Sequence, residues 1–122
     1  MKATAAIPQL RTTDLAGSIR FYTQVLGFEL AFQYQDFYAG VCAGSQAVHL
    51  KLVDAPDPSL AFVRDGAHVH LYVEIDDVRA AARELREKGV RLTRDVYETP
   101  YRTRELSLED DQGHSLYLFE NL

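Results

Sequence analysis

Histidine, tyrosine and glutamate side chains follow one another at alternate positions in a β-rich stretch of this chain. His70, Tyr72 and Glu74 are separated by single apolar residues between positions 68 and 75. Because successive side chains of a strand point to opposite faces, these three residues share one face and the apolar residues share the other. Imidazole and carboxylate groups suit divalent metals, and a tyrosine ring suits a flat ligand. The stretch therefore predicts a chemically active face on a sheet.

Other predicted strands add rings and a second imidazole to that polar face. The same alternation assigns His49 in the stretch 47–53, and Tyr117 and Phe119 in the stretch 115–120, to this face. Further aromatic residues that could line the site are Phe32, Tyr38 and Tyr101. We expect His68 and His114, near strand or turn ends, to face solvent.

The helices and strands that position these residues are predicted from the spacing of apolar residues and from residues that begin or end helices and turns. The pairs Thr13–Asp14 and Asp76–Asp77 each offer a helix N-cap, and Gly27 and Gly89 offer helix stops, which predicts helices over 14–26 and 77–88. Predicted strands are 2–11, 28–35, 37–43, 47–53, 68–75, 90–95, 103–109 and 115–120. The stretch 54–66 contains prolines and aspartates and is predicted to be a connecting loop.

The two halves of the chain repeat one pattern of a strand, a capped helix, a glycine stop and three strands. Gly27 corresponds to Gly89, and Asp14 to Asp76, at an offset of 62 residues. This duplication predicts an α+β fold of paired βαβββ modules that form a cupped mixed sheet with the helices on its convex face. We expect one domain, 1–122, with module one at about 1–53, a linker at about 54–66 and module two at about 67–122.

The stretch from Arg11 to Phe28, RTTDLAGSIRFYTQVLGF, resembles the opening of the vicinal oxygen chelate superfamily, which includes glyoxalases, extradiol dioxygenases and bleomycin-resistance proteins. The ending, LEDDQGHSLYLFE, resembles its closing hairpin. In metal-dependent members, four strand positions supply His and Glu ligands. The resemblance places these positions at Ile7, His49, His70 and Tyr117, so that two of the four cannot supply the family's ligands.

The resemblance therefore implies, first, a metal-free and non-catalytic binding protein of the bleomycin-resistance type, without a cofactor. It would sequester an aromatic or cationic ligand, such as an antibiotic, in an aromatic cup. The alternative is a metal-dependent lyase, dioxygenase or transferase that uses a divalent metal on His49 and His70. The resemblance also implies a homodimer, for which Phe37, Tyr38 and the loop 56–61 offer an apolar rim.

The amino-acid composition and net charge limit the classes of molecule that the protein could bind. The chain has 122 residues, of which 47% are hydrophobic and 25% charged, with a formal net charge of −5. The negative charge argues against nucleic acid and for a cationic partner. A single cysteine, Cys42, excludes an intrachain disulfide and is typical of a reducing cytoplasm, and no apolar run is long enough to predict a membrane span.

Overall fold

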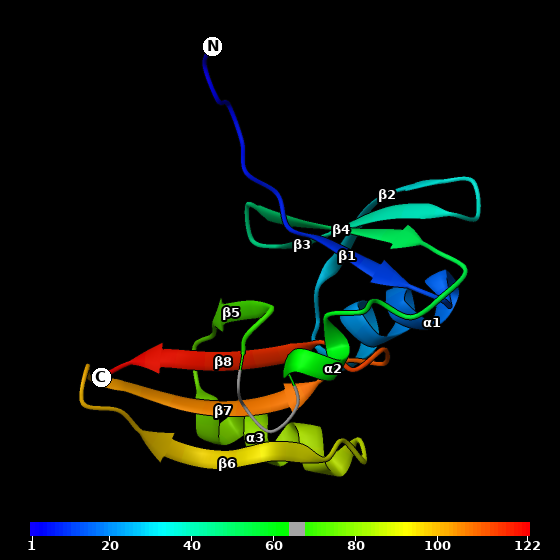
Figure 1. Cartoon of the computed structure of the whole chain (residues 1–122). Coiled ribbons are helices and arrows are strands. Elements are labelled where there is room, and N and C mark those ends of the chain that lie inside the picture. The colour runs from blue at the N-terminus through cyan, green and yellow to red at the C-terminus, as the bar shows by residue number, and fades with distance from the viewer. Residues whose placement is uncertain (64–67) are drawn as a thin grey trace. The chain divides into compact units, whose positions relative to one another are not determined.

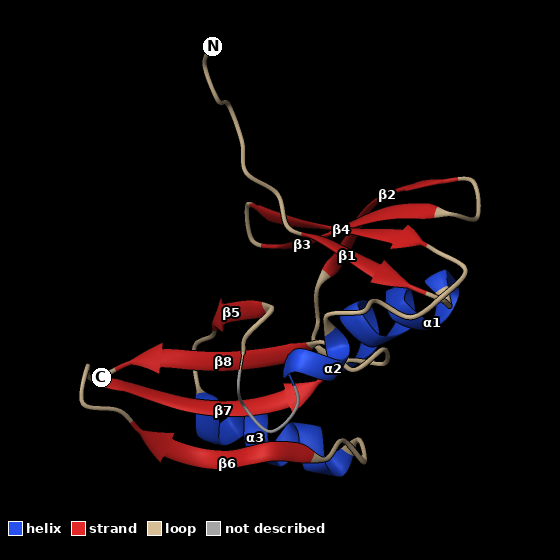
Figure 2. Cartoon of the chain, in the orientation of Figure 1, coloured by secondary structure: helices blue, strands red, loops and turns tan. Residues whose placement is uncertain are grey.

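The computed structural model describes residues 1–63 and 68–122, which form two compact units, Met1–Asp57 and Pro58–Leu122. Each unit contains one four-stranded mixed sheet with a helix packed against it, as Figures 1 and 2 show. The predicted α+β fold of two βαβββ modules is therefore confirmed. The end of the predicted linker and the start of predicted module two fall on positions 64–67 and lie outside the described residues.

The first unit consists of β1 (Gln9–Thr12), α1 (Leu15–Arg20), the π-helical continuation η1 (Phe21–Val25), β2 (Glu29–Tyr34), β3 (Tyr38–Ala43) and β4 (Gln46–Leu52). Its strand order is β1-β4-β3-β2, with β1 parallel to β4 and the other pairs antiparallel. The helix packs on β3 and β4. The core between them is built from Leu10, Leu15, Tyr22, Val41 and Leu50, all of which are buried.

The second unit repeats this order with β5 (Leu71–Glu74), α3 (Val78–Glu87), β6 (Leu92–Glu98), β7 (Thr103–Glu109) and β8 (Ser115–Asn121). The strand order is β5-β8-β7-β6, and β5 runs parallel to β8. A short helix, α2 (Leu60–Val63), precedes β5. This helix lies within the predicted connecting loop over 54–66, and the sequence did not indicate it because four residues are too few to give a helical period.

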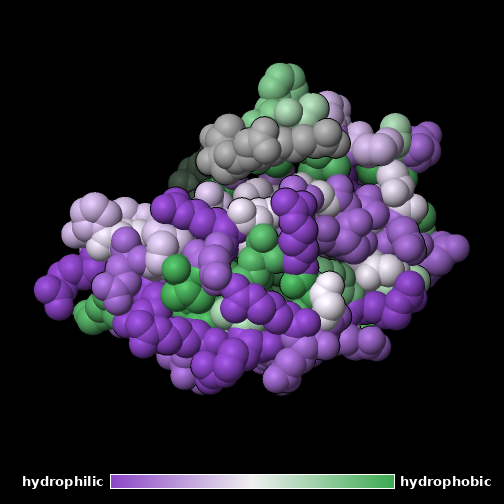
Figure 3. All heavy atoms as spheres, turned by 90° about the horizontal axis from the view of Figure 1, so that it is seen from below, coloured by the Kyte–Doolittle hydropathy of each residue, from purple (hydrophilic) through white to green (hydrophobic). Residues whose placement is uncertain are grey.

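Alternation decides which face of the second sheet is apolar. Val78, Ala82 and Leu85 of α3 are buried, and the helix packs on β6, β7 and β8. The leucines that alternate on the strands are buried with them: Leu71, Leu106, Leu108, Leu116 and Leu118. Figure 3 shows the face that carries α3 and β6, which is covered mostly by hydrophilic side chains.

The N-caps of α1 and α3 are aspartates, and each carboxylate accepts a backbone N–H from the first turn of its helix. Asp14 accepts from Gly17 at 3.0 Å, and Asp77 accepts from Ala80 at 2.9 Å. The helices end at Gly27 and Gly89, whose φ angles are +75° and +77°. Both glycine stops are confirmed, because residues with a side chain rarely adopt this left-handed conformation.

The predicted equivalence of Asp14 with Asp76 was wrong by one residue, because the second cap is Asp77. The first helix therefore has one more residue between its cap and its glycine than the second. The π-helical turn at Phe21–Val25 accounts for the difference, since such a turn accommodates one extra residue within an α-helix. With this turn, Tyr22 is fully buried and Gly27 keeps its offset of 62 residues from Gly89.

Several strand boundaries also differ from the predictions. β1 begins at Gln9 rather than near Lys2, and β5 begins at Leu71 rather than at His68. No helix in the described part of the chain has the length and apolar character needed to cross a membrane.

Candidate functional site

A buried carboxylate surrounded by hydroxyl groups lies on the polar face of the second sheet. Glu105, in the middle of β7, is 1% exposed. Its Oε1 accepts hydrogen bonds from Tyr97 Oη at 2.8 Å and from Tyr101 Oη at 3.5 Å. Its Oε2 accepts from Tyr72 Oη and, at 2.8 Å, from Thr103 Oγ1. We call these five residues the Glu105 cluster.

Strand register brings the Glu105 cluster together from distant parts of the sequence. Tyr97 of β6 lies opposite Glu105, and Phe119 of β8 lies opposite it on the other side. Tyr72 comes from β5, which pairs with β8. Tyr101 lies in the β6–β7 turn, which is closed by a hydroxyl–hydroxyl bond of 2.7 Å between Thr99 and Thr103.

The hydrogen bonds set the protonation states of the cluster. Burial alone would raise the pKa of Glu105, but the four hydroxyl donors together lower it below its ordinary value. Burial and the hydrogen bond to Glu105 raise the pKa of Tyr72 to about 12, and the same two causes raise the pKa of Tyr97. At neutral pH the cluster therefore holds one carboxylate anion among neutral phenols.

Aromatic rings cover this anion and remain partly open to solvent. Tyr72 stacks on Phe119 with ring centroids 4.0 Å apart and planes 10° apart. Tyr72 and Tyr101 are 48% and 66% exposed. The guanidinium carbon of Arg94 lies 3.5 Å from the centroid of the Tyr97 ring. The result is a ring-walled surface above a buried negative charge.

The first unit carries a separate cluster of rings on its sheet. Phe32 and Tyr38 are stacked with centroids 6.2 Å apart, and both meet the His49 ring edge-on at 5.2 and 5.4 Å. The Phe32 ring lies over Gly40, where a Cβ atom would come within 2.2 Å of it. The amide of Gln9 donates to Tyr38 Oη at 2.9 Å, and Tyr38 Oη and His49 Nδ1 share a hydrogen bond of 2.9 Å. We call Phe32, Tyr38 and His49 the first-unit ring cluster.

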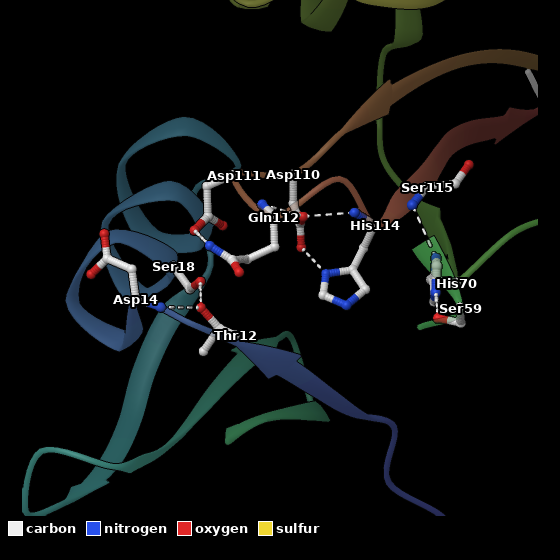
Figure 4. A network of polar contacts seen from close by, with 10 residues as sticks. All are labelled: Thr12, Asp14, Ser18, Ser59, His70, Asp110, Asp111, Gln112, His114 and Ser115. Carbon is white, nitrogen blue, oxygen red and sulfur yellow. Dashed lines mark hydrogen bonds and ion pairs between the residues drawn. The ribbon is translucent and has the colours of Figure 1, made fainter. Parts of the chain in front are cut away.

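Hydrogen bonds at both ring nitrogens hold His70 in one tautomer, and Figure 4 shows these two bonds. The backbone N–H of Ser115 donates to Nδ1 at 3.1 Å, so Nδ1 carries no proton and Nε2 does. Nε2 then donates to Ser59 Oγ at 3.0 Å. Because this tautomer points a proton at the serine hydroxyl, His70 is not placed to act as a base on Ser59.

The prediction that His114 faces solvent was wrong, because the side chain is 1% exposed. Its Nδ1 donates to Asp110 Oδ2 at 2.8 Å, while Asp110 Oδ1 accepts the backbone N–H groups of Gln112 and His114, each at 2.9 Å (Figure 4). The ring meets His70 edge-on, with centroids 4.7 Å apart. The Asp110 carboxylate thus organises the β7–β8 turn and draws the imidazole inward. His68, in contrast, is exposed as predicted.

The residues at the four expected metal positions do not fit a resident metal. Ile7 has a hydrocarbon side chain that is 44% exposed, and the nitrogens of His70 are both engaged by protein groups. His49 Nδ1 is bonded to Tyr38, and Tyr117 supplies a phenol in place of a carboxylate. Within residues 1–63 and 68–122, no group of three or more His, Cys, Asp or Glu side chains could hold a metal ion.

The predicted site residues fall into two groups, one in each unit. Phe32, Tyr38 and His49 form the first-unit ring cluster. Tyr72, Tyr101 and Phe119 meet at or beside the Glu105 cluster, and Tyr117 of β8 is the register partner of Tyr72. Glu74 is exposed and accepts a hydrogen bond of 2.9 Å from Asn121.

The sequence did not indicate Thr103 and Arg94 as site residues; it offered Glu105 as a second carboxylate and Tyr97 as a further aromatic residue, without placing them at the centre of a cluster. Thr103 and Glu105 are two residues apart on β7, so strand alternation places both on the polar face. This alternation can be read from the sequence. The cross-strand pairing of Tyr97 with Glu105 depends on register shifts in β6, on either side of Arg94, that no local pattern indicates.

Comparison with known proteins places this geometry in a family. The model of the Glyoxalase/Bleomycin resistance protein/Dioxygenase superfamily matches residues 4–118. The chain belongs to this superfamily. No curated protein matches it by sequence.

Solved structures agree on the superfamily fold. TioX from Micromonospora sp. ML1 is 17% identical, with a TM-score of 0.74 over 98% of this chain and 97% of that one. Lactoylglutathione lyase from Agrobacterium tumefaciens is 19% identical, with a TM-score of 0.73 over 98% and 94%. The bleomycin-binding protein from bleomycin-producing Streptomyces verticillus, complexed with copper(II)-bleomycin, is 23% identical, with a TM-score of 0.69 over 97% and 96%. At these identities the likeness concerns the fold, and both a lyase and a binding protein share it.

Proposed function

We propose that this superfamily member is a non-catalytic binding protein that captures an aromatic or cationic small molecule, such as an antibiotic, without a resident metal. The observation that carries the proposal is the state of His70. Its Nδ1 accepts a backbone N–H and its Nε2 donates to Ser59, so the imidazole has no lone pair to offer a metal. With Ile7 and Tyr117 at two further ligand positions, three of the four family ligands are missing.

The rings supply the binding chemistry in place of a metal. Phe32 and Tyr38 in the first unit, and Tyr72 and Phe119 in the second, are stacked pairs with exposed or half-buried surface. Stacking of a flat ligand on such a ring adds about 0.5–1.5 kcal/mol beyond the area that it buries. A conjugated ligand could therefore be held by ring contacts alone.

Charge favours a cationic over an anionic ligand. The formal net charge is −5, and the Glu105 carboxylate stays ionised beneath the tyrosines of its cluster. The net negative charge and the Glu105 carboxylate would both attract a ligand with a positive group, and both would repel an anionic ligand. The Streptomyces verticillus protein named above as bleomycin-binding supports capture as a function of this fold.

We further propose that the protein acts as a homodimer in the cytoplasm. Apolar side chains that a second copy could cover include Phe37, which is 41% exposed, and Phe62, which is 78% exposed. Light scattering at tens of micromolar protein should give twice the mass of one chain. A monomer under these conditions would contradict the dimer while leaving ligand capture intact.

The experiment for ligand capture begins with protein purified without an affinity tag. Metal analysis should find less than one equivalent of transition metal, and EDTA should change neither the melting temperature nor ligand binding. A thermal-shift screen of planar aromatic and cationic compounds should then identify a stabilising ligand. One equivalent of copurified metal, together with an activity that EDTA removes, would establish the metal-dependent alternative instead.

Substitutions separate the two functions further. Tyr72→Ala should weaken ligand binding roughly ten- to a hundredfold, because loss of a good ring contact costs about 1–3 kcal/mol. His70→Ala should weaken it only modestly, and Tyr34→Ala, a matched exposed tyrosine of the first unit that belongs to neither cluster, should leave it unchanged. In a metal enzyme, His70→Ala and His49→Ala would be the variants that lose function.

A further inference from the structure

Among the described residues, no cation is paired with the buried anion Glu105. No basic side chain in the described part of the chain forms an ion pair with it. The nearest base in sequence, Arg104, instead pairs with Glu98 at 3.0 Å and with Glu120 at 2.6 Å. Buried carboxylates are ordinarily paired, because desolvating a lone charge is costly. Here neutral hydroxyl groups alone offset that cost.

The hydroxyl groups also decide what kind of cation could complete the cluster. A carboxylate offers about four lone-pair sites, and four hydroxyl donors already occupy Glu105. A metal ion would need free oxygen ligands, which the cluster lacks. What the cluster presents to solvent is instead ring surface, and aromatic faces attract cations that bind without coordinating oxygen.

The chain already places a cation on one of these rings. The guanidinium of Arg94 lies over the Tyr97 ring with its carbon 3.5 Å from the centroid. Arg94 is exposed and, within the described residues, forms no ion pair. Register shifts on both sides of it bring its side chain to this position, as bulges commonly do near sites. Arg94 therefore occupies a cation-binding surface with a side chain that is free to leave it.

From this geometry we propose that the Glu105 cluster binds an alkylammonium group, either quaternary or protonated, and that Arg94 leaves the Tyr97 ring when that group binds. The inference rests on the proposed function, because it names the part of the captured molecule that the second unit receives. Tyr72, Tyr97 and Tyr101 make the contact. Glu105 acts through them as a positioning residue, since its charge orients the phenols and makes their rings more attractive to a cation.

Choline and its neutral isostere 3,3-dimethylbutan-1-ol test the proposal directly. They share the same branched head in charged and uncharged form. Each is titrated into the full-length chain, at ionic strength matched with sodium chloride, while NMR follows the tyrosine ring signals. Choline should shift the rings of Tyr72, Tyr97 and Tyr101 in a saturable manner, and the alcohol should not.

Two variants change choline binding in opposite directions. Arg94→Gln should strengthen it about two- to fivefold, because it removes a competing cation from an exposed ring. Glu105→Gln should abolish the preference for choline over the alcohol, whereas Glu109→Gln, an exposed carboxylate on the same strand, should not. Because Arg94 is exposed, its variant keeps the proposal testable even if Glu105→Gln does not fold.

The outcomes distinguish this inference from the proposed function. Equal shifts with choline and the alcohol, or unchanged or weaker choline binding by Arg94→Gln, would overturn the ammonium site. If the thermal-shift screen then found a neutral aromatic ligand, capture would still stand. If choline bound as expected but a metal-dependent activity were found, the ammonium site would stand and non-catalytic capture would be rejected.

Discussion

Replacement of Glu105 by glutamine should change how two tyrosines release their protons. In the native protein the pKa of Tyr72 is raised from 10.0 to about 12, through burial and the hydrogen bond to Glu105. This is roughly a hundredfold tighter hold on the phenol proton. The pKa of Tyr97 is raised by the same two causes. Tyr72 and Tyr97 should therefore contribute a late component to the ionisation of the phenols.

The same shift makes folding stability depend on alkaline pH. A phenol whose pKa is higher in the folded state binds more protons there than in the unfolded chain, so stability falls as pH rises. The contribution of Tyr72 is complete below pH 10.0 and is lost as the pH rises through about 12. Because the side chain is 48% exposed, solvent screening makes the energetic effect smaller than the shift alone implies.

Alkaline titration with phenolate absorbance measures this directly, with circular dichroism at each pH to define the range in which the fold persists. Glu105→Gln removes the negative charge and should move the late component toward 10.0, while Glu109→Gln should leave it in place. Tyr72→Phe and Tyr97→Phe should each remove part of its amplitude. If the folded native protein shows no late component, the hydrogen bonds of the cluster do not form in solution and the reasoning fails.

Three further predictions concern the elements that hold the two sheets. Asp14→Ala and Asp77→Ala should each lower the free energy of unfolding by about 1 kcal/mol through loss of an N-cap, as measured by urea denaturation. Gly89→Ala should lower the free energy of unfolding by about 1–2 kcal/mol, because φ at this position is +77° and the backbone would be strained. No atom lies within 4 Å of the added Cβ, so steric contact would not contribute. An unchanged free energy of unfolding would contradict this prediction. Leu116→Ala should cost about 2–5 kcal/mol by leaving a cavity beneath α3, whereas Leu30→Ala on exposed β2 should cost much less.

The fold could be predicted because local rules and burial agree along most of the chain. On β8, Leu116 and Leu118 alternate with Tyr117 and Phe119, and an apolar side chain without polar atoms has only the helix-covered face available. An aspartate cap and a left-handed glycine similarly mark the start and the end of the α1–η1 helix and of α3 within a few residues. Such signals are local, so a single sequence contains them.

The misplacement of His114 has a different physical origin. A histidine after a polar turn is ordinarily exposed, but Asp110, four residues earlier, accepts both its backbone N–H and its ring N–H. The carboxylate satisfies the ring N–H, which offsets part of the cost of burying the imidazole. The sequence contains both residues, but their pairing depends on the shape of the turn.

Glu74 and Glu105 show why a polar face can be predicted while its active carboxylate cannot. Alternation assigns both to the same kind of face, and Glu74 stands out because it follows His70 and Tyr72 in sequence. Lateral strand order separates them, since β5 is an edge strand and β7 lies between β6 and β8. At the edge, Glu74 remains exposed with Asn121 as its partner. On the interior strand, Glu105 is shielded from water by a neighbouring strand on each side, so its hydrogen bonds must come from the protein. The strand register places hydroxyl groups beside it rather than cations. A buried anion with hydroxyl partners under solvent-exposed rings is a consequence of strand order, and this arrangement is the basis of the proposal that the second sheet binds a positive group.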